Sequence, residues 1–267
     1  GNYGYVGFGT NNETEFSDLY QYDPSTNSWT QQASLGIGMQ YPLNFVINNI
    51  AYVGMGFSAS KDSVVNRLYA FNPKTDGWIQ TRAFPGVPRL NGIGFSAGNK
   101  GYVGLGFGQI NGAQGPLLND IWQYDPATDS WTQKTSFPGS IIPSYPAVFM
   151  IDSLSFIAGT TWSSSFTFSN LLWEYNTVTD VWTQKNNFPG ETAVQANAMD
   201  INNTGYLLSG GENWKYNQAS DSWTQLPFFT QRLAGSAFAI GNYGYFGLGY
   251  GFPGPMNTDL WQFTPGQ

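Results

Sequence analysis

The chain has 267 residues, of which 10% are charged and 17% aromatic, and its formal net charge is −7. The acidic balance excludes a phosphate-backbone partner, because nucleic-acid binding needs a basic face. We find no run of about 20 apolar residues and therefore expect no membrane insertion. His and Cys are both absent. Their absence excludes Ser-His-Asp and Cys-His catalytic sites and zinc or copper sites built from these residues, so we expect no cofactor.

In chain order, the first recurring element is a short apolar run that ends in small residues. Small residues beside such a run predict a strand packed close to a neighbouring backbone. The six copies are GYVGFG from Gly4, AYVGMG from Ala51, GYVGLG from Gly101, SFIAGT from Ser155, GYLLSG from Gly205 and GYFGLG from Gly244.

The second recurring element is an aromatic residue followed seven positions later by Trp. Its five copies are Tyr22–Trp29, Phe71–Trp78, Tyr124–Trp131, Tyr175–Trp182 and Tyr216–Trp223. The residues between the aromatic pair are turn formers such as Asp23-Pro24, so each copy predicts a β-hairpin. A sixth copy begins at Asp259 and reaches Gln267 before its Trp.

A third element, another apolar run, precedes five of the glycine-rich strands. These runs cover residues 44–47, 92–97, 147–151, 196–201 and 236–240. Each full repeat therefore has four strands, and repeats of this kind and length are the signature of β-propellers. We predict an all-β fold, a six-bladed propeller with four-stranded antiparallel blades.

The glycines that end the second strand, the aromatic of the third and the Trp of the fourth resemble the kelch repeat. The residue pattern of these repeats is similar to that of surface-exposed kelch proteins of Bacteroidetes-type bacteria. The blades resemble those of the central domain of galactose oxidase. The usual Gly-Gly pair is present only at Gly210-Gly211. The copper site of galactose oxidase cannot be assembled here, because it needs His and a Cys-linked Tyr.

In kelch folds the strands of a blade are counted from the central channel outward. By this resemblance the first blade lacks its inner strand and the last blade its outer strand, which leaves twenty-two strands. We expect residues 1–267 to form a single propeller domain of a longer chain, whose flanking segments supply both strands.

Acidic residues begin the third strand in four of the six repeats. They are Asp18, Asp120, Glu212 and Asp259, whereas Arg67 and Leu171 stand at the other two positions. Carboxylates at equivalent positions are candidate ligands for a cation such as Ca²⁺. The alternative is structural, namely bonds to local backbone amides or to a basic neighbour. We expect the structural role and no metal.

The resemblance places binding on the face made by second-to-third-strand loops and by connections between blades. Trp162 and Phe166 lie in one such loop, where an aromatic could stack on a sugar or anchor a protein. The alternative is packing within the propeller. Arg82, Arg89 and Arg232 lie in the connections. They are candidates for capturing an anionic ligand, and the alternative for them is ion pairing between blades.

Three functions follow as hypotheses. The first is a non-enzymatic binding module that recognises a protein or a glycan. The second is a sugar-active, epimerase-like enzyme that uses Arg, Tyr and carboxylates. The third is a structural module of a larger outer-membrane or adhesin assembly. Because charged residues usually make up about a quarter of a chain, the low value here indicates secretion or display at a bacterial cell surface.

Overall fold

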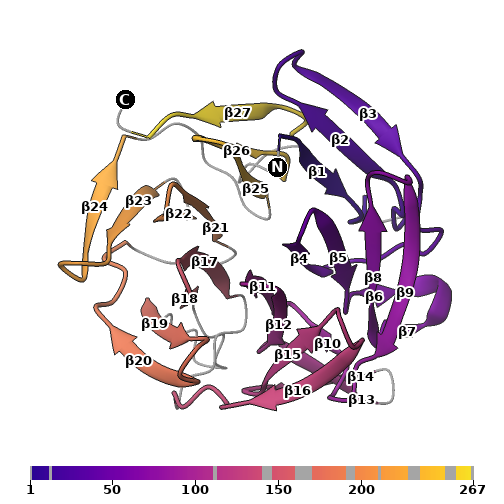
Figure 1. Ribbon diagram of the computed structural model, residues 1–267, viewed down its shortest axis with the longest axis horizontal. Coiled ribbons are helices and arrows are strands. Elements are labelled where there is room, and N and C mark those ends of the chain that lie inside the picture. The colour runs from indigo at the N-terminus through magenta and orange to yellow at the C-terminus, as the bar shows by residue number, and fades with distance from the viewer. Residues whose placement is uncertain are drawn as a thin grey trace. The chain divides into compact units, whose positions relative to one another are not determined.

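The computed structural model describes residues 2–11, 14–110, 113–139, 146–159, 170–190, 196–209, 212–227, 235–249 and 257–265. They belong to two compact units, Gly1–Pro138 and Gly139–Gln267, and each unit holds three antiparallel sheets of the predicted repeat (Figure 1). None of these residues forms a helix long and apolar enough to cross a membrane.

The first unit contains one three-stranded and two four-stranded blade sheets. Blade 1 is β1 (Gly4–Gly7), β2 (Leu19–Asp23) and β3 (Ser28–Gln32). Blade 2 is β4 (Leu43–Ile47), β5 (Ile50–Gly54), β8 (Arg67–Asn72) and β9 (Gly77–Ala83). Blade 3 is β11 (Ile93–Ala97), β12 (Lys100–Gly104), β15 (Ile121–Asp125) and β16 (Ser130–Lys134).

The second unit contains two four-stranded blade sheets followed by one three-stranded sheet. Blade 4 is β17 (Ala147–Ile151), β18 (Leu154–Gly159), β19 (Leu171–Asn176) and β20 (Val181–Lys185). Blade 5 is β21 (Asn197–Ile201), β22 (Thr204–Ser209), β23 (Glu212–Asn217) and β24 (Ser222–Leu226). Blade 6 is β25 (Ser236–Ile240), β26 (Tyr243–Gly247) and β27 (Leu260–Phe263).

The predicted blade strands are all present, so the strand count and the two incomplete terminal blades are confirmed within the described residues. The structure adds strands where the sequence predicted only loops. Between the second and third strands of blade 2 lie β6 (Phe57–Ser58), a 3₁₀ turn (Ala59–Lys61) and β7 (Ser63–Val64). Beside blade 3, β13 (Phe107–Ile110) pairs with β14 (Ala113–Leu117) and with β10 (Arg89–Leu90).

The hairpin predicted from the aromatic–Trp spacing forms in every complete copy. Tyr124 lies directly opposite Trp131, for example, and their ring centroids are 4.9 Å apart. The turn residue between them, Asp129, has φ 46°, and its equivalents have positive φ as well. Asp and Asn tolerate this left-handed conformation better than bulkier side chains do, which explains their place in the repeat.

The core of each unit lies between neighbouring blades. In the first unit, Phe45 of blade 2 packs in one cluster with Val103 and Tyr124 of blade 3. A Cβ on Gly101 would clash with the Phe45 ring, so glycine is required there for close approach of the two blades. Phe84, which follows β9, packs edge-on against both Trp122 and Trp131 of blade 3. The recurring aromatics therefore join the blades.

Candidate functional site

The second-to-third-strand connections of the first unit are joined to one another by side-chain hydrogen bonds. We call the described residues of these connections, 8–11, 14–18, 55–66, 105–110 and 113–120, the loop face. The Glu15 carboxylate in blade 1 accepts a 2.7 Å hydrogen bond from the Ala59 amide in blade 2. The Gln109 side-chain oxygen in blade 3 accepts a 2.7 Å hydrogen bond from the Val64 amide in blade 2. The blade 2 connection is thus held on both sides.

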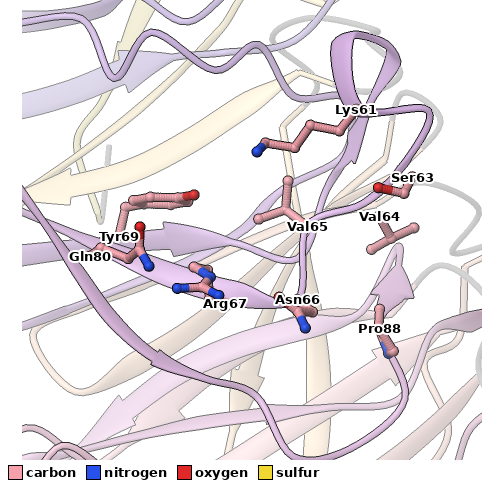
Figure 2. A pocket seen from close by; sticks show the side chains of 9 residues that line it. All are labelled: Lys61, Ser63, Val64, Val65, Asn66, Arg67, Tyr69, Gln80 and Pro88. Atoms are coloured by element: carbon pink, nitrogen blue, oxygen red, sulfur yellow. The ribbon is translucent and has the colours of Figure 1, made fainter.

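A hollow of about 420 Å³ opens at the blade 2 part of this face. We call it the blade 2 hollow (Figure 2). Its lining comprises two cations, several neutral polar side chains and an apolar wall: Lys61, Arg67, Ser63, Asn66, Tyr69, Gln80, Val64, Val65 and Pro88. No carboxylate is among the described residues that line it.

Two hydrogen bonds made by Gln109 hold two lining residues of the hollow, Val64 and Pro88. Its side chain binds the amide of Val64, and its own amide donates a 3.1 Å hydrogen bond to the Pro88 carbonyl. Two further lining residues, Val65 and Tyr69, are buried in an apolar cluster with Met39 and Val53. The hollow is therefore formed by the fold itself.

Arg67 enters the hollow from the first position of β8. The pairing of β8 with β9 shifts register between Arg67 and Tyr69, whereas the corresponding pairs in the other complete hairpins keep one register. Such a β-bulge twists a strand and redirects side chains, and bulges are over-represented beside functional sites. The Thr81 hydroxyl stabilises the bulge by donating a 2.9 Å hydrogen bond to the Leu68 carbonyl.

A second hollow, of about 380 Å³, lies between the connections of blades 1 and 2. Its acidic group is Glu15, which is already bound to the Ala59 amide and to the Gln40 side chain at 3.0 Å. This carboxylate joins two loops, so the second hollow offers less unused bonding capacity than the first.

Arg89, a predicted ligand-binding residue, is fully buried. Its guanidinium forms a two-pronged ion pair with Asp120, with N–O distances of 2.8 and 2.9 Å, and donates to the Leu105 carbonyl. Burial alone would raise the pKa of Asp120, but the hydrogen bonds and charge of Arg89 outweigh burial and lower it. This geometry favours the structural alternative for Arg89, namely pairing with the acid that begins a third strand.

Three of the four acids at that repeat position bind a nearby indole. Asp120, Glu212 and Asp259 each accept a hydrogen bond from the indole of the Trp two residues later. Together with Asp18, these weak metal candidates belong to four different blades. Within the described ranges, no three acidic side chains gather closely enough to hold a metal ion.

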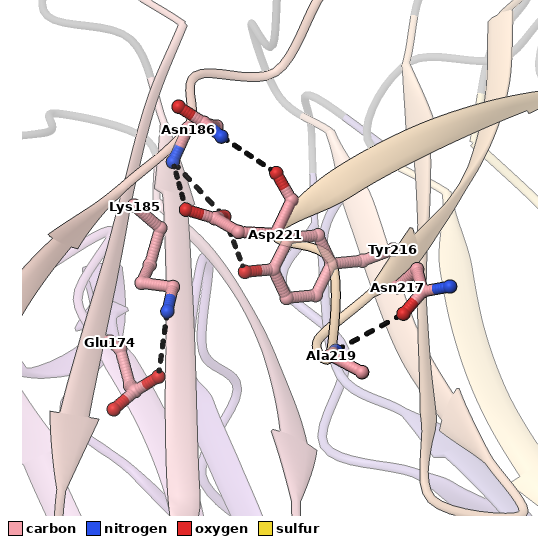
Figure 3. Close-up of polar contacts among 7 residues, drawn as sticks. All are labelled: Glu174, Lys185, Asn186, Tyr216, Asn217, Ala219 and Asp221. Atoms are coloured by element: carbon pink, nitrogen blue, oxygen red, sulfur yellow. Dashed lines mark hydrogen bonds and ion pairs between the residues drawn. The ribbon is translucent and has the colours of Figure 1, made fainter.

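Two close Tyr–carboxylate pairs connect neighbouring blades. In blade 5 the Tyr216 hydroxyl donates a 2.7 Å hydrogen bond to Asp221, whose carboxylate also accepts from the Asn186 amide of blade 4 (Figure 3). Burial, followed by the hydrogen bond to Asp221, raises the pKa of Tyr216 well above its ordinary value. The Tyr124 hydroxyl donates in the same way to Asp129 of blade 3, whose carboxylate accepts from the Arg82 backbone amide of blade 2. A tyrosine with a raised pKa is a poor proton donor at neutral pH.

The remaining predicted site residues are placed as follows. The Arg82 side chain is exposed near the end of β9. Trp162, Phe166 and Arg232 lie outside the described residues, so their proposed binding roles stay predictions.

Comparison with known proteins supports the fold. The Kelch motif model matches residues 8–36, which cover β2 and β3 of blade 1 with the connections on either side. A search of curated proteins finds no match. Among solved structures 491 chains match, and one titled "Structure of YjhT" superposes with a TM-score of 0.79. That match has 15% sequence identity and covers 94% of this chain and 89% of the other.

The chain has a six-bladed kelch-type β-propeller fold. Sequence analysis of this propeller missed Lys61, Gln80 and Gln109 as lining or supporting residues of the hollow. Arg67 carried a signal, since it is a cation at a repeat position where four other blades have an acid. A second sequence signal is the spacing of Met39, which precedes Tyr52 by thirteen residues, as Arg89 precedes Tyr102. This spacing indicates that Met39 stands at the repeat position of Arg89.

Proposed function

We propose that this kelch-type propeller is a non-enzymatic, protein-binding module that uses the loop face of its first three blades. The observation that carries the proposal is the pair of hydrogen bonds, from Ala59 to Glu15 and from Val64 to Gln109, that joins the three connections. A surface ordered before binding loses less conformational entropy when a partner docks. Connections of variable sequence on a rigid scaffold are also where binding residues concentrate.

Exposed aromatic side chains on and beside this face supply anchors for a partner. Phe16 is 38% exposed and Tyr41 is 53% exposed. Tyr41 directly follows Gln40, which pairs with Phe57 of the blade 2 connection. Large aromatic side chains of this kind often dominate the binding energy of protein interfaces.

The proposal includes display at a bacterial cell surface. Its support is the composition, since a chain with few charged residues and a polar surface of Asn, Ser, Thr and Gly is unusual in the cytosol. Accessibility of the native protein to protease on intact cells tests this location. Degradation only after cell lysis would contradict it.

A binding screen against surface proteins and glycans tests the function. We expect Phe16→Ala and Tyr41→Ala to weaken the binding of a protein partner by about tenfold each, as for interface anchors. Ile79, which is 68% exposed on β9 and outside the loop face, supplies the matched control Ile79→Ala. A partner that is equally sensitive to all three substitutions, or only to the control, contradicts the choice of face.

A further inference from the structure

We infer that the blade 2 hollow binds an acidic side chain of the protein partner through Arg67 and Lys61. This inference rests on the proposed function and gives the chemistry of its central contact. The guanidinium of Arg67 and the ammonium of Lys61 line the same hollow (Figure 2). A guanidinium presents paired N–H donors that match the two oxygens of a carboxylate.

The first argument is the unused charge of these two residues. The chain has a net charge of −7 and only ten Lys and Arg residues. Arg89, Lys100 and Lys185 are each paired with an acid. In the part of the chain that the structure describes, neither Arg67 nor Lys61 forms an ion pair.

The second argument comes from the equivalent positions in blade 3. There the third strand is preceded by Asp120, which the buried Arg89 neutralises. In blade 2 the acid is replaced by Arg67 and the arginine by Met39, which is buried among apolar side chains. The equivalence is structural, because Gln40 pairs with Phe57 as Leu90 pairs with Phe107. Blade 2 is thus closed by apolar packing, and folding does not use the charge of Arg67.

The third argument is that the remaining lining suits a side chain better than a sugar ring. Tyr69, the only aromatic among the described lining residues, is 7% exposed and offers no open platform for stacking. Val64, Val65 and Pro88 form an apolar wall that fits the methylene groups of Glu or Asp. Asn66 and Gln80 provide neutral hydrogen-bonding groups for the adjacent peptide backbone.

The test uses the whole chain and a library of 15-residue acidic peptides, each paired with a version in which Asn and Gln replace Asp and Glu. We expect binding of acidic members, and a loss of about tenfold or more in affinity for their neutral versions, as for a charge-assisted hydrogen bond. Arg67→Met should reduce the affinity by a similar factor. Arg67→Lys should retain part of it, because the charge remains.

Lys74 supplies the matched control, since it is exposed in the turn at the other end of β8. Lys74→Met removes the same charge and should leave the affinity unchanged. Equal losses for Arg67→Met and Lys74→Met would show attraction by net charge alone and would overturn the inference. Acidic-peptide binding that is insensitive to Arg67→Met would overturn it as well.

Two further arms separate the inference from the proposed function. If oligogalacturonate binds through Arg67 and no acidic peptide does, the ligand is an acidic glycan and the inference fails. If neither probe binds, but the partner found in the screen still depends on Tyr41, the inference fails and the proposed function stands.

If Arg67→Met does not fold, the wild-type chain is titrated with the best peptide instead, and the NMR signal of the Arg67 guanidinium is monitored. An unshifted signal would then refute the inference.

Discussion

Blades 2 and 3 solve the same packing problem with opposite chemistry. Both continue from the glycine-rich second strand into a connection that folds back beside the preceding segment. In blade 3 the buried ion pair between Arg89 and Asp120 fills the space beside this connection. In blade 2 the apolar side chain of Met39 stands at the position of Arg89. The cation of blade 2, Arg67, is left lining a hollow.

The difference between the two blades shows that the role of a charged residue in a repeat depends on which residue it contacts in the folded structure. Replacing a buried ion pair by apolar groups is often neutral for stability, whereas breaking the pair on one side is costly. A repeat can therefore give up the pair only when both positions change. In blade 2 both have changed, which leaves Arg67 available for binding.

The largest expected effect comes from placing an unpaired charge in blade 2. Met39→Arg buries a second cation near Arg67 and should destabilise the fold by about 3–5 kcal/mol, as an uncompensated buried charge does. The double variant Met39→Arg with Arg67→Asp recreates the blade 3 pair and should be more stable than Met39→Arg alone. Urea unfolding measures both, and Met39→Leu is the size control. A double variant no more stable than the single one would contradict the equivalence of the two blades.

Breaking the pair of blade 3 should have the next largest effect. Arg89→Met leaves the partly buried Asp120 without its cation and should cost about 3 kcal/mol. Adding Asp120→Asn removes the uncompensated charge and should recover part of this loss. The four free energies of unfolding form a double-mutant cycle, in which simple additivity of the two substitutions would show that the pair is uncoupled.

The pH dependence of stability should reveal the same pair with a smaller effect. Because the pKa of Asp120 is lowered in the folded state, its ionised form stabilises the fold at pH values above the ordinary pKa of about 4. This contribution is lost as pH falls through the lower folded-state pKa. The stability difference between the wild type and Asp120→Asn should therefore shrink between pH 7 and pH 3. A difference that stays constant over this range would exclude the pair as its source.

We expect the smallest effect on stability from replacing Arg67, the arginine of blade 2. Arg67→Met removes a partly exposed side chain with no ion pair in the described residues and should change the free energy of unfolding by at most about 0.5 kcal/mol. Thermal and urea unfolding of this variant, measured beside Arg89→Met, give the contrast directly. A loss comparable to that of Arg89→Met would show that blade 2 also needs its cation for folding.

Sequence alone was sufficient for the fold because its signals are local and repeated. The Tyr124–Trp131 spacing, with turn-forming residues between them, specifies a hairpin whatever surrounds it, and the other copies confirm the period. The short strands β13 and β14 could not be predicted in this way. They lie in a connection whose sequence is not repeated in the other blades. Their pairing partner β10 comes from an earlier segment of the chain.

The candidate site shows where local signals end. Sequence analysis named Arg89 as a candidate anion-binding residue in a connection between blades, and named Arg67 only as a non-acidic residue at the position that begins a third strand. Only the tertiary structure decided that Arg89 is buried against Asp120 while Arg67 lines a hollow with Lys61. The physical reason is that the free energy of a charge depends on which groups surround it, and folding brings those groups together from distant segments.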